Sequence, residues 1–319
     1  MRFEIIGNGA IGNLYGAKLL QAGYVVHFWT RTMERAHLLQ IEGITLQDRA
    51  GQMSTSMNGT YRQLQEQEFA LHLLDYKATE EVFILLTVKQ TQLNNDLLHH
   101  MKLLLAQYPN CTLIAFQNGI GHIERLAELT TKPIITAVTS EAALTVKAHY
   151  VNHTGIGLTT LGDQLRRDCE GIRQKILEEV LFKAGFNTLV SKNIREAIYR
   201  KLIVNAVINP LTALFGVKNG QLPANCTRLQ LMEQLFEETR TILALEEAEI
   251  AAVRFDQVLH ICEATSSNSS SMLSDVLADR ETEIVTINGA IVEMASHRGN
   301  EAPLNNALVQ LILALHPEK

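Results

Sequence analysis

The sequence predicts an α/β domain built on a parallel sheet, followed by an all-α domain. In the first half, short apolar strand-like runs alternate with helical apolar spacing, which is typical of a parallel sheet with right-handed crossovers. After about residue 190 only helical spacing remains. A chain of 319 residues fits about two domains of roughly 150 residues each. We therefore expect one domain over residues 1–190 and a second over 191–319.

The first domain is predicted to begin with a strand at Phe3–Ile6 and a helix at Ile11–Ala22, which Gly23 ends. The run Val82–Val88 is apolar almost throughout, as expected for a strand buried on both faces. The other predicted strands are Val25–Trp29, Leu113–Phe116 and Ile134–Val138.

Two further segments depart from the strand–helix alternation. Residues 47–68 are rich in Gln, Ser and Thr and are predicted as an irregular or hairpin insertion. Residues 149–162 alternate Gly and Thr with apolar residues, which favours antiparallel strands that close the domain. The second domain is predicted to consist of helices over residues 194–215, 228–250, 254–265, 271–298 and 304–315.

Composition excludes several classes of function. The chain has 28 Lys and Arg against 34 Asp and Glu, a formal net charge of −6, which argues against nucleic-acid binding. We expect no membrane span, because no apolar run reaches the necessary length of about 18 residues. We also expect no signal peptide, because the first residues form a short strand that runs into a glycine turn, and we therefore expect a cytoplasmic location. Without an H-E-x-x-H motif we expect no metal. Reduced thiols are expected at the four scattered cysteines, Cys111, Cys169, Cys226 and Cys262.

A G-x-G-x-x-G motif lies between the first predicted strand and helix. The first glycine allows a tight turn, the second allows a pyrophosphate to approach the backbone, and the third allows the helix to pack closely on the strand. The helix N-terminus then offers free N–H groups to the anion. In this context the motif predicts a Rossmann-type dinucleotide-binding domain, with an ordinary glycine turn as the alternative. Its residues are Gly7, Asn8, Gly9, Ala10, Ile11 and Gly12.

The end of the second predicted strand favours NADPH over NADH. No carboxylate is present there to hold a ribose 2′-hydroxyl, whereas Thr30 and Arg31 could hold a 2′-phosphate. The alternative for Arg31 is an ordinary surface arginine. Lys89 and Asn118 follow two later strands and are candidate contacts to cofactor or substrate, although each by itself is compatible with a solvated loop.

The second domain carries a polar stripe on an otherwise apolar helix. Lys201, Asn205 and Asn209 are spaced i, i+4 and i+8, so they share one face about 80° wide. This stripe is either a solvated face or the lining of a cavity. A lysine there could protonate the oxygen of a ketone as hydride reaches its carbon, and asparagines could orient the substrate.

Residues 268–289 contain a second group of candidates. The serines around Ser271, together with Asn268, precede a helical pattern and could bind a carboxylate, although a capped flexible loop is the alternative. Glu283 lies at the edge of an apolar face, where it is either solvated or an acceptor for a substrate hydroxyl.

Taken together, these residues make the chain similar to the ketopantoate reductase (2-dehydropantoate 2-reductase) family along nearly its whole length. The resemblance is carried by the glycine motif, Lys89, the NGIG segment at 118–121, KLIVNAVINPLTAL at 201–214, and SSML, TEI and ING within 270–289. It implies a Rossmann-type domain, a helical domain like the C-terminal domain of 6-phosphogluconate dehydrogenase, and NADPH-dependent reduction of 2-dehydropantoate to (R)-pantoate, a step toward pantothenate and coenzyme A.

The resemblance also implies residue roles. Lys201 matches the general acid, Glu283 the acceptor of the substrate hydroxyl, and Arg31 and Lys89 match cofactor contacts. The resemblance further implies that Asn118 bridges the cofactor and the catalytic lysine. The other implied substrate contacts are Asn205, Asn209, Asn268 and Ser271. A homodimer through the helical domain is compatible with the sequence, and two alternatives stay open: a reductase of another 2-keto acid and a non-catalytic dinucleotide sensor.

Overall fold

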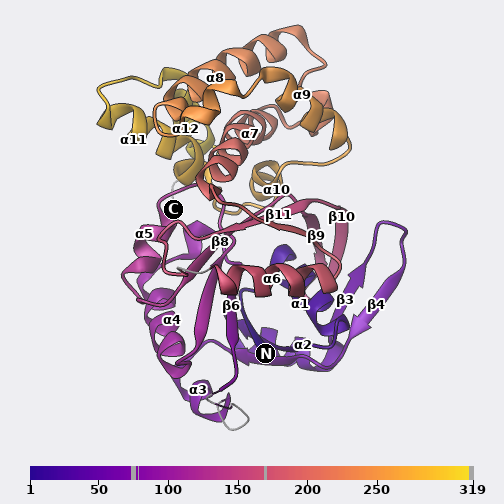
Figure 1. Ribbon diagram of the computed structural model, residues 1–319. Coiled ribbons are helices and arrows are strands. Elements are labelled where there is room, and N and C mark those ends of the chain that lie inside the picture. The colour runs from indigo at the N-terminus through magenta and orange to yellow at the C-terminus, as the bar shows by residue number, and fades with distance from the viewer. Residues whose placement is uncertain (73–76, 78, 169–170, 316–319) are drawn as a thin grey trace. The chain divides into compact units, whose positions relative to one another are not determined.

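The computed structural model describes residues 1–72, 77, 79–168 and 171–315 (Figure 1). The chain divides into two compact units, residues 1–117 with 122–194, and residues 118–121 with 195–319. The first unit is α/β and the second is helical. The predicted fold class is therefore confirmed.

The first unit is built on an eight-stranded sheet with the order β12-β11-β8-β7-β6-β1-β2-β5. Neighbouring strands from β5 to β8 are parallel, and β11 is antiparallel to β8. The segment β5-β2-β1-β6-β7-β8 has the strand order of a Rossmann-type domain. The strands are β1 Arg2–Ile6, β2 Val25–Thr30, β5 Thr60–Gln63, β6 Val82–Leu86, β7 Cys111–Ala115, β8 Ile134–Thr139, β11 Leu158–Gly162 and β12 Asn187–Val190.

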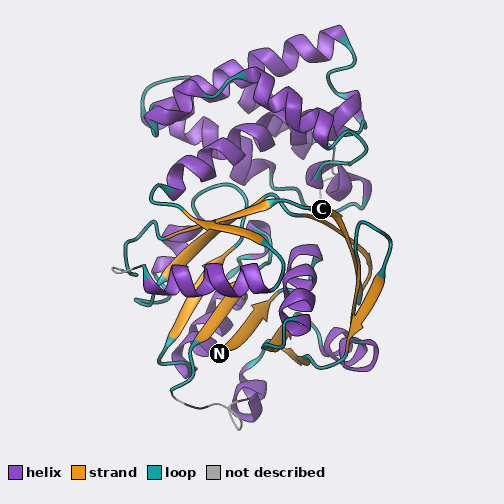
Figure 2. Cartoon of the chain, turned by 45° about the vertical axis from the view of Figure 1, so that its right-hand side comes forward, coloured by secondary structure: helices purple, strands orange, loops and turns teal. Residues whose placement is uncertain are grey.

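Helices cover both faces of this sheet (Figure 2). Side chains alternate along a strand, so Phe3 and Ile5 of β1 join one apolar core and Ile6 joins the other. The first core contains residues of α1 (Ala10–Gln21) and α6 (Ile172–Lys183). The second contains residues of α4 (Asn95–Gln107) and α5 (His122–Ala127). Two further helices are α2, Met33–Glu42, and α3, Glu66–His72.

The region predicted as an insertion is partly a hairpin. β3 (Ile44–Gln47) and β4 (Met53–Ser56) are antiparallel and belong to a small sheet. Its order is β4-β3-β10-β9, where β10 is Tyr150–Gly155 and β9 is Ala142–Lys147. The same region also contains β5, which pairs parallel with β2 in the main sheet. The prediction missed β5 because four mostly polar residues, Thr-Tyr-Arg-Gln, carry little strand signal.

The predicted antiparallel strands in residues 149–162 are confirmed, but they divide between two sheets. β10 (Tyr150–Gly155) is antiparallel to β9 (Ala142–Lys147) in the small sheet. β11 is antiparallel to β8 in the main sheet. The small sheet contributes Leu46 and Val151 to the core that α1 fills.

The second unit contains helices around one apolar core. They are α7 Ile194–Phe215, α8 Cys226–Ala244, α9 Phe255–Ala264, α10 Ser271–Leu277, α11 Ala290–His297 and α12 Pro303–Leu313. Two predicted helices are wrong in extent. The helix expected over 228–250 ends at Ala244, and the one expected over 271–298 is interrupted after Leu277. The interruption contains Asp279 at φ +48°, a left-handed conformation that ends a helix.

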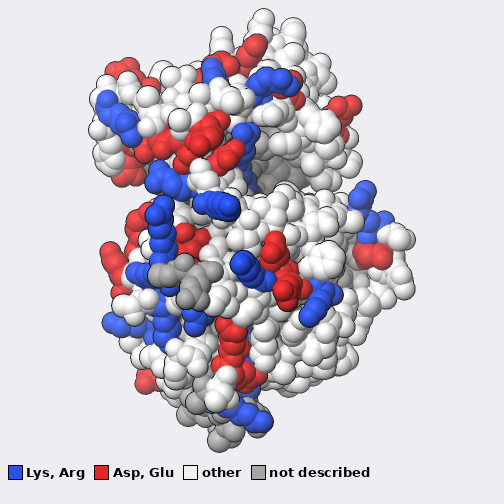
Figure 3. All heavy atoms as spheres, in the orientation of Figure 1, with Lys and Arg blue, Asp and Glu red and all other residues white. Residues whose placement is uncertain are grey.

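The surface and the cysteines complete the description. Within the described ranges, no helix is long and apolar enough to cross a membrane. Acidic and basic side chains are interspersed on the face shown in Figure 3. Cys111, Cys226 and Cys262 are free thiols, and Cys169 lies outside the described residues. No group of three or more His, Cys, Asp or Glu that could hold a metal occurs among the residues described.

Candidate active site

The carboxyl ends of four parallel strands meet at one edge of the main sheet. Ile6 at the end of β1 lies beside Trp29 and Leu86, and Leu86 lies beside Ala115. The loops that follow these strands carry the glycine motif, Arg31 and Lys89, so the structure brings these predicted cofactor contacts to the same edge. Ligands of open α/β sheets bind at this edge.

The glycine loop has the shape that a pyrophosphate needs. Gly7 has φ +101°, and a Cβ on Gly12 would lie 2.0 Å from the Gly7 carbonyl oxygen, so neither position accepts a side chain. A Cβ on Gly9 would meet no atom of the described chain within 4 Å, which leaves open space beside its backbone. Helix α1 begins at Ala10 without a side-chain cap, so the N–H groups of its first turn remain for an anion. The residues present therefore fit a dinucleotide.

At the end of β2, one of the two predicted phosphate ligands is exposed to solvent and the other is buried. Arg31 is exposed, whereas Thr30 is buried and its hydroxyl donates to the Thr32 carbonyl at 2.8 Å. Arg35, in the first turn of α2, was missed by sequence reasoning. Its Nη2 donates to the Asn8 carbonyl oxygen at 3.3 Å and, with the Asn8 amide turned, to the Asn8 side-chain oxygen at 3.0 Å. Arg35 therefore supports the glycine loop from α2.

Side chains also brace the loops that follow β6 and β7. The Gln117 amide donates to the carbonyl oxygens of Leu86 at 2.9 Å and Val88 at 2.8 Å. Gln90 Nε2 lies 3.0 Å from Nδ1 of His122. His122 is 2% exposed, and burial lowers its pKa to about 4, so the ring is neutral near pH 7. The half-buried Lys89 lies in the loop between the residues that Gln117 and His122 hold. Sequence reasoning did not identify these two supporting side chains.

In the helical unit, the polar stripe of α7 is not a solvated face. Asn209 is buried, and Lys201 and Asn205 are half-buried. Burial lowers the pKa of Lys201 to about 8, and the negative charge of Glu283 acts in the opposite direction. An ammonium with this pKa is still charged near neutral pH and gives up its proton more readily than an ordinary lysine.

Glu283 is also buried, with 4% of its surface exposed, so the solvated interpretation of this residue is wrong. Its Oε2 accepts a hydrogen bond from Nδ2 of Asn118 at 3.0 Å, although the two residues are 165 positions apart. The helical unit with its 118–121 segment thus brings an amide donor, a carboxylate and an ammonium together. A carbonyl compound placed there would meet both a proton donor and a hydrogen-bond acceptor.

The serine segment is organised differently from the stripe. Ser270, and not the exposed Ser271, caps α10 by accepting from the Leu273 N–H at 3.0 Å. The Thr212 hydroxyl of α7 also donates to Ser270 Oγ at 2.7 Å. Asn268 is half-buried and its carbonyl accepts from the Asn219 N–H at 3.0 Å. The serine segment is therefore joined to α7 through Ser270.

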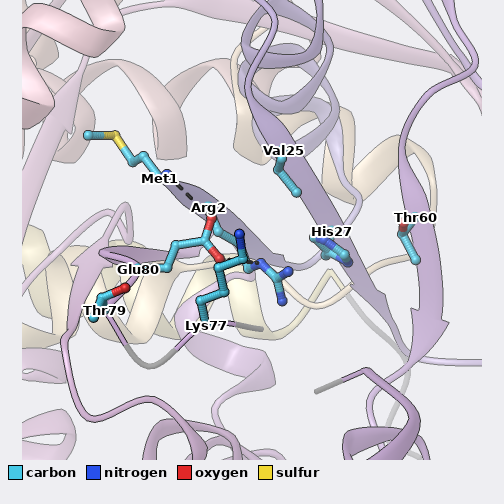
Figure 4. Close-up of a pocket in the computed structure, with 8 residues that line it drawn as sticks. All are labelled: Met1, Arg2, Val25, His27, Thr60, Lys77, Thr79 and Glu80. Atoms are coloured by element: carbon cyan, nitrogen blue, oxygen red, sulfur yellow. Dashed lines mark ion pairs between the residues drawn. The ribbon is translucent and has the colours of Figure 1, made fainter. Parts of the chain in front are cut away.

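A separate hollow of about 630 Å³ lies at the opposite edge of the main sheet (Figure 4). Arg2, Val25 and Thr60, the first residues of β1, β2 and β5, line it. Glu80 pairs there with the Met1 amino group at 3.3 Å and with Arg2 Nε at 3.6 Å. Because this hollow lies at the amino ends of the strands, it is not the site beside the glycine loop.

Comparisons with known proteins match the chain to one protein family over both units. The family described as "Ketopantoate reductase PanE/ApbA" matches residues 3–165, and the one described as "Ketopantoate reductase PanE/ApbA C terminal" matches residues 193–316. A curated 2-dehydropantoate 2-reductase of Listeria innocua is 32% identical over 317 residues, covering 99% of this chain and 97% of the relative.

Solved structures show the same likeness. The crystal structure of the probable 2-dehydropantoate 2-reductase panE of Bacillus subtilis is 30% identical with a TM-score of 0.77, covering 99% of this chain and 100% of that one. A ternary structure of D-mandelate dehydrogenase with NADH and anilino(oxo)acetate is 23% identical with a TM-score of 0.83, covering 99% and 98%. The second likeness concerns the fold alone.

Proposed function

The chain belongs to the ketopantoate reductase family, and from this membership we propose that it catalyses the NADPH-dependent reduction of 2-dehydropantoate (ketopantoate) to (R)-pantoate. NADPH, when bound, supplies the hydride for the C2 ketone. The observation that carries the proposal in this chain is the cluster of Lys201, Glu283 and Asn118 in the helical unit. Neither the reductase of another 2-keto acid nor the dinucleotide sensor is favoured by the relatives.

Lys201 is the general acid in this proposal. Negative charge develops on the ketone oxygen during reduction, and the ammonium group stabilises this charge and donates its proton to the oxygen. The lowered pKa of about 8 supports the role, because proton donation is most effective when the pKa of the donor lies near the working pH.

Glu283 accepts the hydrogen bond of the substrate hydroxyl. A buried carboxylate needs hydrogen-bond donors, and Asn118 supplies one to Oε2. The hydroxyl of ketopantoate would supply another, and an analogue that lacks it would leave the carboxylate short of a donor. This shortage is the physical basis for discrimination against simpler 2-keto acids.

The remaining predicted site residues bind and orient. We assign the cofactor to the first domain, residues 1–190, and the substrate to the second, residues 191–319. The cofactor contacts are Gly7, Asn8, Gly9, Ala10, Ile11, Gly12, Arg31, Lys89 and Asn118, and the neutral substrate contacts are Asn205, Asn209, Asn268 and Ser271. Neutral amides and a hydroxyl can form hydrogen bonds that orient the substrate, and they add no charge beside the Lys201 ammonium.

A steady-state assay of NADPH oxidation tests the proposal. Ketopantoate should give a much higher kcat/KM than ketoisovalerate, which has the same 2-keto acid group without the hydroxyl. Glu283→Ala should remove most of this preference. Equal kcat/KM values for both substrates in the wild type would favour the broader 2-keto acid reductase. Binding of NADPH without turnover of any keto acid would favour the sensor.

We also propose a cytoplasmic location, a small-molecule substrate with neither nucleic acid nor a membrane as a partner, and a homodimer for which the helical unit offers the surface. The scattered cysteines support the location, and the acidic composition argues against nucleic acid as a partner. Light scattering on the purified protein decides the oligomeric state, since a monomer mass of 35.6 kDa at micromolar concentration would contradict the dimer.

A further inference from the structure

Helix α7 contains a backbone carbonyl that its own helix cannot satisfy. In an α-helix the N–H of residue i donates to the carbonyl of residue i−4, so the carbonyl of Ala206 needs the N–H of residue 210. Residue 210 is a proline inside α7 and has no N–H. A buried carbonyl without a partner is costly, and the surrounding structure has to supply a donor.

The missing donor comes from Asn288. Its Nδ2 donates to the Ala206 carbonyl oxygen at 3.0 Å, across 82 positions of sequence. The same nitrogen donates to Oδ1 of Asn305 at 2.9 Å, so both hydrogens of the amide are used. Asn305 is itself held by Glu238, whose Oε1 accepts from Asn305 Nδ2 at 2.9 Å. The Asn288 side chain is fully buried, and rotating its amide would turn an oxygen toward two other oxygens.

Asn288 lies in the segment that presents Glu283. The π-helical turn Val285–Gly289 begins two residues after Glu283, and the Ile287 N–H donates to the Glu283 carbonyl at 3.0 Å. π-Helical turns are rare in proteins, and those that occur are often found at functional sites. The hydrogen bond from Asn288 therefore ties the turn that follows Glu283 to the helix that carries Lys201.

We propose that Asn288 is a positioning residue that sets Glu283 against Lys201 by docking on the carbonyl that Pro210 leaves unpaired. Pro210 leaves one carbonyl of α7 without a donor from its own helix, and this gives Asn288 a buried acceptor at a single position of the helix. The position of the Glu283 turn then depends on the amide of Asn288. The inference rests on the roles proposed above for Lys201 and Glu283.

The test is a pair of substitutions combined in one chain. Pro210→Ala supplies the missing N–H, and because a carbonyl oxygen has two lone pairs, Asn288 can keep its hydrogen bond. We expect Pro210→Ala to retain kcat within about threefold. Asn288→Ala leaves the Ala206 carbonyl unpaired, so the unfolding midpoint should fall and kcat should fall by roughly 10- to 100-fold, with the KM for NADPH unchanged.

The double variant separates positioning from stability. In Pro210→Ala/Asn288→Ala the Ala206 carbonyl has a donor again, although Asn305 Oδ1 still lacks the Asn288 amide. The unfolding midpoint should therefore recover in part while kcat stays low. Recovery of kcat together with the midpoint would overturn the proposal, because Asn288 would then serve stability alone. Should Asn288→Ala fail to fold, the comparison is made between Pro210→Ala and the double variant, and equal kcat values there would overturn it as well.

The dependence of kcat/KM on pH provides a second test, because a purely structural role of Asn288 would not change it. Displacing Glu283 removes the charge that raises the pKa of Lys201, so the alkaline fall in kcat/KM should begin at lower pH in the double variant than in Pro210→Ala. Asn225→Ala, which removes the cap of α8, is the matched control for lost stability and should leave the profile unchanged. Identical profiles in Pro210→Ala and the double variant would contradict the proposal. A wild type inactive on ketopantoate would instead refute the proposed function.

Discussion

The proton carried by Lys201 makes the rate of reduction depend on pH, with a sign that the structure determines. Burial lowers the pKa of Lys201 to about 8, and the Glu283 carboxylate limits that decrease. A general acid works only while protonated. The value of kcat/KM should therefore be constant at pH values below this pKa and should fall as the pH rises through it.

The size of the effect follows from the same pKa. At a pKa of about 8, roughly nine-tenths of the molecules carry the proton at pH 7 and about one-tenth carry it at pH 9. The expected fall in kcat/KM between these pH values is therefore roughly tenfold. A lysine with an ordinary pKa of about 10.4 would still be about 96% protonated at pH 9, so its rate would hardly change.

The assay is the initial rate of NADPH oxidation with ketopantoate between pH 6 and pH 10, analysed as kcat/KM because this quantity reports the free enzyme. Glu283→Gln removes the charge that raises the pKa of Lys201, so its alkaline fall should begin at lower pH. Lys201→Ala should lower kcat by about 10²–10⁴ with little change in NADPH affinity. A fall that begins only near pH 10, or near-normal turnover by Lys201→Ala, would refute the role of Lys201.

Four further substitutions test the surroundings of the site. Arg31→Glu should weaken NADPH far more than NADH in fluorescence titrations, and equal losses would show that Arg31 does not contact the 2′-phosphate. Arg35→Gln releases Asn8 and should weaken both cofactors alike, so a loss confined to NADPH contradicts a role in supporting the loop. Gln117→Leu should lower the free energy of unfolding by about 1–3 kcal/mol in urea titrations, because two carbonyls lose their donor, and an unchanged value argues against the brace. The pKa of His122 rises from about 4 to its usual 6.5 on unfolding, so stability should fall by up to about 3 kcal/mol as pH decreases from 6.5 to 4. His122→Gln should flatten this dependence, and an unchanged pH dependence of urea unfolding contradicts the assignment.

Much of the α/β unit was predictable because its signals are local. The glycine motif combines a turn, a helix start and a close approach within six consecutive residues, and the structure has each of these features at Gly7, Gly9 and Gly12. Apolar runs such as Val82–Leu86 indicate a buried strand from neighbouring residues alone. The short polar strand β5 lacked such a run, and only its pairing with β2 makes it a strand.

The helical unit was predictable in content and less so in its breaks. Periodicity indicated helices on both sides of residues 278–283, but it continues through them and gave no sign of the interruption. The left-handed Asp279, together with the hydrogen bond from the Arg280 N–H to the Asp275 carbonyl, ends α10 there. The π-helical turn at Val285–Gly289 likewise has no simple sequence pattern.

For the site, the sequence by itself determined which residue types were available and which of them share a helix face, because spacing along one element follows from its pitch. Lys201, Asn205 and Asn209 were found in this way. Only the tertiary structure decided that Glu283 is buried and bonded to Asn118, and that Asn288 replaces the donor that Pro210 lacks. These contacts join residues that are far apart along the chain, and their formation depends on how whole helices pack around a common core, which no local pattern encodes.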